Sequence, residues 1–142
     1  MPCPRFFNER NTYMKIVVLE RNSVGPDIPV DYSALGEVTY YPNTVTVEEV
    51  KERIADADIV VSNKAPMRKE SLQDAPNVKL ICEFATGYDN VDIAYCKERG
   101  IKVANVVDYS TDMVAQHTFT LALTLLQKLP HYDNYVKSGA YS

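Results

Sequence analysis

Residues 15–19 read Lys-Ile-Val-Val-Leu, and residues 59–61 (Ile-Val-Val) and 78–81 (Val-Lys-Leu-Ile) have the same character. In these stretches apolar and β-branched residues follow one another directly, with few polar residues between them. Consecutive apolar residues are typical of strands that are covered on both faces, as in parallel sheets. The three stretches therefore predict a parallel sheet that helices must cover.

Five strand-like runs recur along the chain, and polar segments lie between them. The expected strands are Ile16–Leu19, Glu37–Tyr41, Asp58–Ser62, Lys79–Phe84 and Lys102–Val107. The alternation of strand and helical segment predicts an α/β fold. We expect a flavodoxin-like open parallel sheet of five strands, joined by right-handed crossovers, with helices on both faces.

The clearest helix between the strands is predicted at Val47–Ala57. Thr46 can cap it, acidic residues occupy its first turn, and its apolar residues follow helical spacing. Weaker helices are expected at Tyr32–Leu35, Lys69–Asp74 and Val91–Arg99. Gly100 follows the last of these, at a position where glycine commonly ends a helix.

A long carboxy-terminal helix is predicted from Ser110 or Thr111, either of which can cap it, to about Leu129. Pro130 should close it. Residues 119–126 are apolar except for two threonines, which predicts a helix buried on all sides but too short to cross a bilayer. Its cover must come from a further domain, a second copy of the chain, or both, and we expect a homodimer through Thr111–Leu129.

The composition excludes several classes of protein. Of 142 residues, 46% are hydrophobic and 24% are charged, which is ordinary for a folded domain and unlike a disordered chain. A net charge of −4 gives no basic surface for nucleic acid, and a membrane is not expected as a partner either. The odd number and wide spacing of Cys3, Cys82 and Cys96 argue against disulfides and a metal site and favour a reducing cytoplasm.

The sequence contains no catalytic apparatus that can be recognised without further information. Its five glycines do not form a G-x-G-x-x-G motif, so no dinucleotide cradle is expected. The only imidazoles are His117 and His131. A single histidine within an apolar helix is more often a packing residue than a base, and we assign His117 no catalytic role.

The turn Phe84-Ala85-Thr86-Gly87-Tyr88-Asp89-Asn90-Val91-Asp92 leaves the fourth strand at its carboxyl end. Ligands bind at that edge in open α/β sheets. Gly87 permits a turn that larger residues resist, and the N–H groups of Thr86 and Gly87 can form a site for a carboxylate. Spacing alone favours a simpler interpretation, a tight turn in which Asp89 or Asn90 caps the next helix.

Four motifs in fixed order carry a family resemblance. They are Lys79–Asp92, Cys96–Ile101, Val103–Val106 and the segment Tyr109–Thr118. From about Met14 to its end, the chain resembles the amino-terminal portion of the D-isomer-specific 2-hydroxyacid dehydrogenases. That family includes D-lactate dehydrogenases, glycerate dehydrogenases (hydroxypyruvate reductases) and phosphoglycerate dehydrogenases.

The resemblance implies a division of the chain and an activity for the longer protein. Residues 1–13 are expected to be a disordered extension, and 14–108 the amino-terminal part of a substrate-binding domain. Residues 109–142 would be a hinge and a helix leading into an NAD-binding Rossmann domain outside this chain. The enzyme would use NAD to interconvert a 2-keto acid and a D-2-hydroxy acid. The family's catalytic Arg, Glu and His lie beyond the Rossmann motif and outside this chain, so no catalytic residue is assigned here and the chain alone should be inactive.

The resemblance also implies roles for individual residues. The expected substrate-binding residues are Thr86, Gly87, Asn63, Lys64 and Tyr109, and Val114 is expected to approach the nicotinamide. Plainer interpretations stay open: a turn cap for Asn63, a solvated Lys64, and packing roles for Tyr109 and Val114. The alternative function is a non-enzymatic flavodoxin-like module that dimerises through its last long helix.

Overall fold

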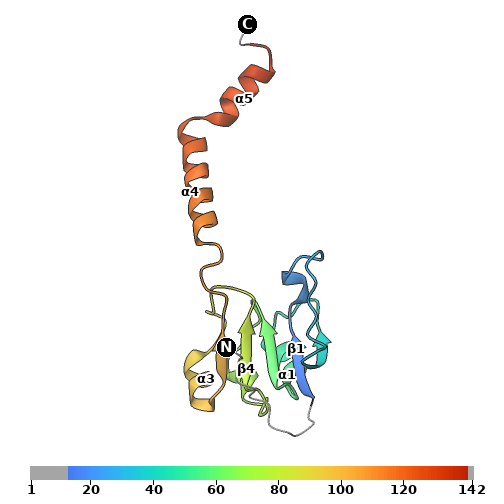
Figure 1. Ribbon diagram of the computed structural model, residues 1–142. Helices are drawn as coiled ribbons and strands as arrows, with labels where there is room; N and C mark the ends of the chain where they lie inside the picture. Colours follow the sequence, from blue (N-terminus) through green and yellow to red (C-terminus); the bar gives the residue numbers. More distant parts are fainter. Residues whose placement is uncertain (1–12, 141–142) are drawn as a thin grey trace, which may run out of the picture. The chain divides into compact units, whose positions relative to one another are not determined.

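The computed structural model describes residues 13–140, and the chain divides between Val107 and Asp108 into two compact units. The first unit contains a β-sheet with short helices, and the second contains two helices (Figure 1). The disordered extension predicted for residues 1–13 lies, apart from Tyr13, outside the described residues.

The first unit is built on one parallel sheet with the strand order β2-β1-β3-β4-β5 (Figure 1). The strands are β1 (Met14–Val18), β2 (Gly36–Tyr40), β3 (Ile59–Ser62), β4 (Leu80–Glu83) and β5 (Lys102–Ala104). The predicted five-stranded parallel sheet is therefore confirmed. The two stretches of consecutive apolar residues that begin at Ile16 and Ile59 form its central pair of strands.

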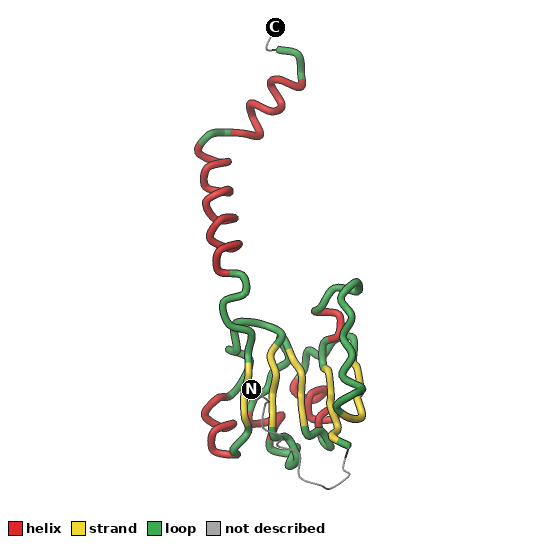
Figure 2. The backbone as a smooth tube through the Cα atoms, viewed as in Figure 1, coloured by secondary structure: helices red, strands yellow, loops and turns green. Residues whose placement is uncertain are grey.

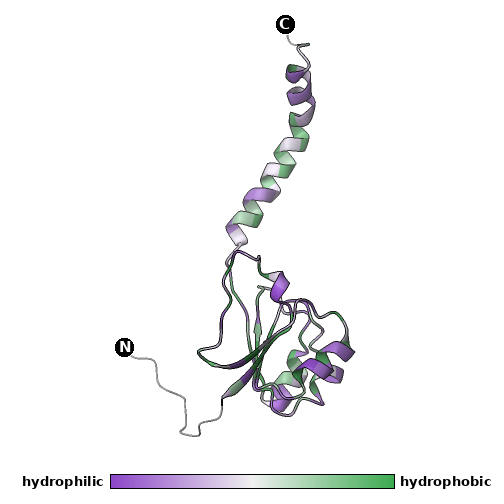
Figure 3. Cartoon of the chain, turned by 90° about the vertical axis from the view of Figure 1, so that its right-hand side faces the viewer, coloured by the Kyte–Doolittle hydropathy of each residue, from purple (hydrophilic) through white to green (hydrophobic). Residues whose placement is uncertain are grey.

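Three helices pack on one face of this sheet (Figure 3). They are α1 (Val47–Ile54), α2 (Lys69–Leu72) and α3 (Ile93–Arg99). The core between helices and sheet includes the buried side chains of Val17, Val60, Ile81, Ile54 and Leu72. From β2 onward, every crossover leads in the same direction through the sheet, and right-handed connections then place all three helices on the same side.

The second face of the sheet is covered differently. Its buried side chains are Ile16, Val18 and Val61, and Tyr32 from the β1–β2 connection packs against them. That connection runs in the opposite direction through the sheet, so a right-handed path brings it to this face. Helical cover, predicted for both faces, is therefore found on one face among residues 13–107.

The helix predicted at Tyr32–Leu35 is wrong. The β1–β2 connection holds only the short 3-10 helix η1 (Arg21–Ser23) and turns. Pro26 and Pro29 interrupt helical hydrogen bonding in this segment, and the Asp31 carboxylate accepts a bond from the Ser33 N–H at 2.8 Å, which closes a turn instead.

Helix ends in the first unit are fixed mostly as the sequence predicts. Thr46 and Glu49 form a capping box at α1, and Gly100 ends α3 with a left-handed φ of 74°. The cap of α3 differs from the expectation: Asp92, not Asp89 or Asn90, accepts the N–H of Tyr95, at 3.0 Å. Asn90 is thereby free for the tertiary contacts described below.

The second unit consists of α4 (Thr111–Leu126) and α5 (Leu129–Lys137). The predicted closure at Pro130 is wrong, because the helix already ends at Leu126 and Lys128 adopts a left-handed φ of 51°. Pro130 instead lies in the first turn of α5, where its missing N–H has no helical partner to lose. Ser110 occupies the N-cap of α4 without a side-chain bond, and the Thr111 hydroxyl donates to Asp108.

Apolar side chains of α4 are exposed along its length, and Figure 3 shows apolar residues recurring along this helix. Phe119 is 69% exposed and Leu125 is 77% exposed. No helix within residues 13–140 has the length and apolarity needed to cross a bilayer.

Gly36 provides a test of the sheet register. It starts β2 beside Met14, and a Cβ added there would lie 2.0 Å from the Met14 carbonyl oxygen. We expect Gly36→Ala to lower the free energy of unfolding by about 1–3 kcal/mol, because strand backbone must shift to admit the methyl group. Urea denaturation followed by circular dichroism measures the change.

Gly25→Ala is the matched control, because a Cβ at Gly25 meets nothing within 4 Å. Equal effects of the two substitutions would contradict this account of the β1–β2 pairing.

Candidate functional site

The candidate site lies at the edge of the first unit where the parallel strands end. All five strands point the same way, so the connecting loops that follow them leave at one edge (Figures 1 and 2). The loops after β3 and β4 are neighbours there, since the Phe84 N–H donates to the Ser62 carbonyl oxygen at 2.8 Å. Sequence positions that are about 20 residues apart thus meet at this edge.

In the loop after β4, two consecutive carbonyl groups accept hydrogen bonds from the segment that follows β5. The Ala85 carbonyl oxygen accepts the Val106 N–H at 3.0 Å. The Thr86 carbonyl oxygen accepts the side-chain amide of Asn105 at 2.7 Å. Thr86 and Gly87 are exposed, and their own N–H groups donate to no acceptor within residues 13–140.

The direction of these N–H groups follows from the carbonyl bonds. In a trans peptide the carbonyl of one residue and the N–H of the next point in opposite directions, and no cis peptide occurs among the described residues. The N–H of Thr86 therefore points away from Val106, and that of Gly87 points away from Asn105. Two adjacent donors are left on the outer side of the loop, which is the arrangement that binds an anion such as a carboxylate.

The reason predicted for Gly87 is wrong. Among the described glycines, positive φ angles occur at Gly100 and Gly139, so the backbone at Gly87 is one that other residues adopt. A Cβ at Gly87 would meet only the Asp89 carboxylate, at 3.8 Å. The glycine is therefore not needed for the backbone conformation of the turn. Because it has no side chain, it leaves open space beside its exposed N–H group.

Glu20, two residues after the end of β1, is a residue that the sequence analysis missed. It is only 6% exposed, and its carboxylate accepts four hydrogen bonds from the end of β3 and the loop that follows. The donors are the Ser62 hydroxyl (3.1 Å) and the N–H groups of Asn63 (2.7 Å), Lys64 (2.9 Å) and Ala65 (3.1 Å). The Glu20 carboxylate thus holds the backbone of this loop, while Asn63 is half-buried and Lys64 is exposed.

Asn90 joins the loops after β3 and β4. Its side-chain amide donates to the Ala65 carbonyl oxygen at 3.0 Å and to a Glu83 carboxyl oxygen at 3.2 Å. The Met67 N–H donates to the Asn90 carbonyl oxygen at 3.0 Å. These hydrogen bonds link the two loops at this edge of the sheet.

Glu83, the last residue of β4, is a buried titratable group next to the candidate site. It is 3% exposed, and its Oε2 has no hydrogen-bond partner within the described residues. The pKa of Glu83 is raised to about 7, mainly because burial disfavours the charged carboxylate and to a smaller extent because of the nearby charge of Glu20. The Asn90 hydrogen bond and the positive charge of Lys64 lower the pKa but do not offset the burial.

Four of the six predicted site residues come from neighbouring loops of the first unit. Asn63 is half-buried, and Lys64, Thr86 and Gly87 are exposed at the same edge. Tyr109 and Val114 belong instead to the second unit, where Tyr109 precedes α4 and Val114 lies in its first turn. Both are exposed.

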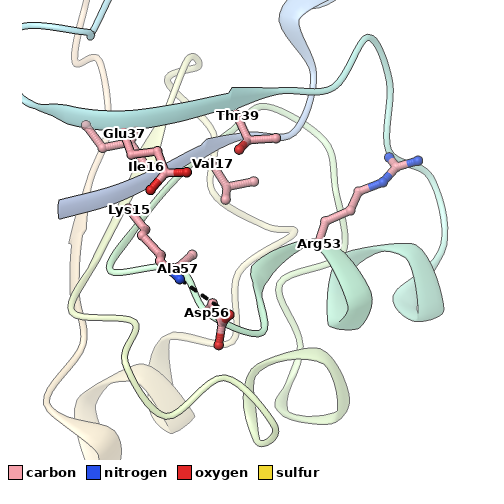
Figure 4. A pocket seen from close by; sticks show the side chains of 8 residues that line it. All are labelled: Lys15, Ile16, Val17, Glu37, Thr39, Arg53, Asp56 and Ala57. Atoms are coloured by element: carbon pink, nitrogen blue, oxygen red, sulfur yellow. Dashed lines mark hydrogen bonds and ion pairs between the residues drawn. The ribbon is translucent and has the colours of Figure 1, made fainter. Parts of the chain in front are cut away.

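A cavity of about 160 Å³ lies elsewhere, near the amino end of β1 and the outer strand β2 (Figure 4). Three of its four charged lining residues are paired, Lys15 with Asp56 at 3.4 Å and Arg53 with Glu49 at 3.2 Å, whereas Glu37 forms no ion pair within residues 13–140. Within residues 13–140 no group of three or more His, Cys, Asp or Glu residues can hold a metal ion. The glycines of the first unit lie in separate segments, so the described residues do not fit the phosphates of a dinucleotide.

Comparison with known proteins gives consistent matches. A family model described as "D-isomer specific 2-hydroxyacid dehydrogenase, catalytic domain" matches residues 16–139. Hydroxypyruvate reductase of Blautia hydrogenotrophica is 40% identical over 133 residues, which cover 90% of this chain and 41% of that protein. Glycerate dehydrogenase of Methylorubrum extorquens is 36% identical over 128 residues, which cover 90% of this chain and 40% of that protein.

A solved structure is similar in fold as well. D-lactate dehydrogenase from Aquifex aeolicus, complexed with NAD and lactic acid, superposes with a TM-score of 0.67 at 30% identity, covering 90% of this chain and 38% of that one. The chain thus spans about 40% of the length of the curated relatives named above.

The raised pKa of Glu83 predicts an unusual dependence of stability on pH. The folded chain binds the Glu83 proton more tightly than the unfolded chain, so the free energy of unfolding should fall as pH rises from the ordinary value of 4.5 to about 7. The loss is at most roughly 3 kcal/mol. Glu83→Gln cannot ionise, so it should lack this fall and be more stable than the wild type above neutral pH. Urea denaturation on either side of this pH range measures both.

Glu52→Gln, which removes a carboxylate from an exposed position on α1, is the control and should retain the pH dependence of the wild type. The same dependence in Glu83→Gln and the wild type would contradict the burial of an ionisable Glu83.

Proposed function

The chain belongs to the D-isomer specific 2-hydroxyacid dehydrogenase family, and on that basis we propose that it is the substrate-binding part of an NAD-dependent enzyme. The proposed reaction interconverts a 2-keto acid and a D-2-hydroxy acid by hydride transfer. Because the chain spans about 40% of the length of its curated relatives, this activity is a proposal about a longer protein.

The observation that carries the proposal is the pair of exposed N–H groups at Thr86 and Gly87. A carboxylate has two oxygens, and each can accept one of the two adjacent N–H donors. No acceptor within residues 13–140 competes for these donors. The two N–H groups thus suit the one group that all 2-keto acids and 2-hydroxy acids share.

Side chains beside this pair complete the proposed substrate site. The Lys64 ammonium adds a positive charge near the carboxylate, and the Asn63 carboxamide can donate to the keto or hydroxyl oxygen. Their backbone is held by Glu20, so these side chains start from a fixed loop. Fixing the substrate carboxylate orients the adjacent carbon for reaction, which lowers the entropic part of the barrier.

NAD supplies the hydride in this proposal and is bound mainly by residues outside this chain. We place Tyr109 near the substrate and Val114 near the nicotinamide, on the strength of the family match. Residues 105–110 serve as a hinge across the division between the two units. We assign no catalytic residue to this chain and propose that it is inactive alone.

We also propose a cytoplasmic location, which the free cysteines Cys82 and Cys96 suit.

The second unit supports a proposal of its own, a homodimer through Thr111–Leu129. Phe119 and the four Leu side chains of α4 are more than half exposed, and burying each one contributes about 1.5–3 kcal/mol. Dimerisation without enzymatic activity is the second candidate function, and these exposed side chains are the observation that favours it.

Binding of 2-keto acids by the chain tests the proposed substrate site. In an NMR titration of the ¹⁵N-labelled chain with pyruvate, glyoxylate or hydroxypyruvate, we expect saturable shifts of the Thr86 and Gly87 amides. The affinity should be weak, with a dissociation constant of about 1–10 mM, because this chain supplies only part of the proposed cleft.

Pyruvamide is the control, since it keeps the keto group but lacks the carboxylate and should leave both amides unshifted. Equal shifts with pyruvamide, or no saturable shift with any of the keto acids, would rule out the proposed carboxylate site.

Light scattering tests the proposed dimer. At about 100 µM, a concentration at which stable interfaces are populated, the chain should have twice the mass of one 16.0 kDa chain. Phe119→Lys, in α4, should shift the mass toward the monomer. Val45→Lys, at an apolar residue that is 76% exposed in the first unit, should leave the dimer intact. A monomeric wild type would contradict the proposal.

A further inference from the structure

Asn105 stands at the point where β5 ends, next to the loop after β4. It follows Ala104, the last residue of β5, and its side chain is half-buried. The side-chain amide donates to the Thr86 carbonyl oxygen at 2.7 Å, across 19 residues of sequence. Thr86 precedes Gly87, so this bond acts on the peptide group that carries the Gly87 N–H.

The two bonds that hold the loop differ in their dependence on sequence. The Val106 N–H that binds the Ala85 carbonyl belongs to the backbone, and most residues at position 106 would supply it. The Asn105 bond requires a side-chain donor of the right length. The direction of the Gly87 N–H therefore depends on the identity of residue 105, while that of Thr86 does not.

We propose that Asn105 is a positioning residue: by holding the Thr86 carbonyl, it directs the Gly87 N–H toward the carboxylate of the substrate. This inference rests on the proposed function of the Thr86–Gly87 pair. Asn105 would contact no substrate itself and would act through the peptide group that joins Thr86 to Gly87. Because Asn105 lies three residues before Asp108, where the second unit begins, it also ties this pair to the proposed hinge.

The loop keeps its other attachments when Asn105 is changed. Val106 still holds Ala85, and Asn90 still holds the loop after β3 at the far end. Within residues 13–140, the Asn105 bond is the one hydrogen bond to the peptide group of Thr86 and Gly87 between these two points. Loss of the donor should therefore rotate one peptide group and leave the fold in place.

The test compares the full chain with Asn105→Asp, Asn105→Ala and the control Asn77→Asp. Asp matches Asn in size, but its carboxylate donates no hydrogen bond and repels the Thr86 carbonyl; Ala removes the donor without adding charge. Asn77 is exposed in the turn before β4, at the opposite edge of the sheet. Residual dipolar couplings report the directions of the Thr86 and Gly87 N–H bonds, and a pyruvate titration reports the dissociation constant.

In both Asn105 variants we expect a changed dipolar coupling at Gly87 and a retained one at Thr86. The dissociation constant for pyruvate should rise about tenfold, as expected for the loss of one hydrogen bond to a charged group. Asn77→Asp should match the wild type in every reading. Denaturant titration establishes that each variant is folded under the conditions of the assay.

A purely structural role for Asn105 would lower stability but leave the Gly87 coupling and the pyruvate affinity unchanged, and this result would overturn the inference. If the wild type binds no keto acid, the proposed function fails, whereas the dipolar couplings still decide whether Asn105 directs the Gly87 N–H. If neither Asn105 variant folds, a scalar coupling across the hydrogen bond between Asn105 Nδ2 and the Thr86 carbonyl carbon decides in the wild type. Its absence would overturn the inference.

Discussion

A planar trans peptide has its carbonyl and its N–H on opposite sides, and the candidate site depends on that constraint. At the loop after β4, the segment that follows β5 binds two consecutive carbonyl groups, at Ala85 and Thr86. The N–H groups of Thr86 and Gly87 must then face the other way. An anion site results from satisfying the acceptors of the loop, although the loop has no basic side chain and carries the carboxylates of Asp89 and Asp92.

The rest of the edge keeps this loop and its neighbour in place. Buried polar groups need partners, and here the partners come from different strands. The carboxylate of Glu20, just after β1, accepts hydrogen bonds from the backbone after β3, and Asn90 links that backbone to β4. Glu83 completes the set as a buried carboxyl group with a raised pKa. The polar groups of this edge therefore bind one another, and their hydrogen bonds hold the backbone from which the proposed ligand-binding side chains extend.

The parts of the fold that the sequence predicted are those with local causes. Consecutive β-branched residues mark β1 and β3, and Thr46 with Glu49 marks the start of α1, because neighbours in sequence create these signals. The helix expected at Tyr32–Leu35 does not form, because Pro26 and Pro29 interrupt helical hydrogen bonding upstream and the Asp31 carboxylate closes a turn with the Ser33 N–H. Pro130 was assigned to the end of one helix although it begins the next, and proline suits both positions.

The candidate site was predictable in place but not in mechanism. Thr86 and Gly87 follow a strand at its carboxyl end. The sequence motif around them and the expected parallel sheet are enough to locate this position. The partners that give these residues their geometry are remote in sequence: Glu20 binds residues more than 40 positions away, and Asn105 binds Thr86 from 19 positions away. No local sequence pattern predicts pairings of residues so far apart.

The central claim is tested most directly by a crystal structure of the chain with oxamate, a carboxylate analogue of the keto acids. We predict its two carboxylate oxygens within about 2.7–3.1 Å of the Thr86 and Gly87 nitrogens. A carboxylate bound elsewhere, or these nitrogens bonded to protein acceptors, would contradict the account.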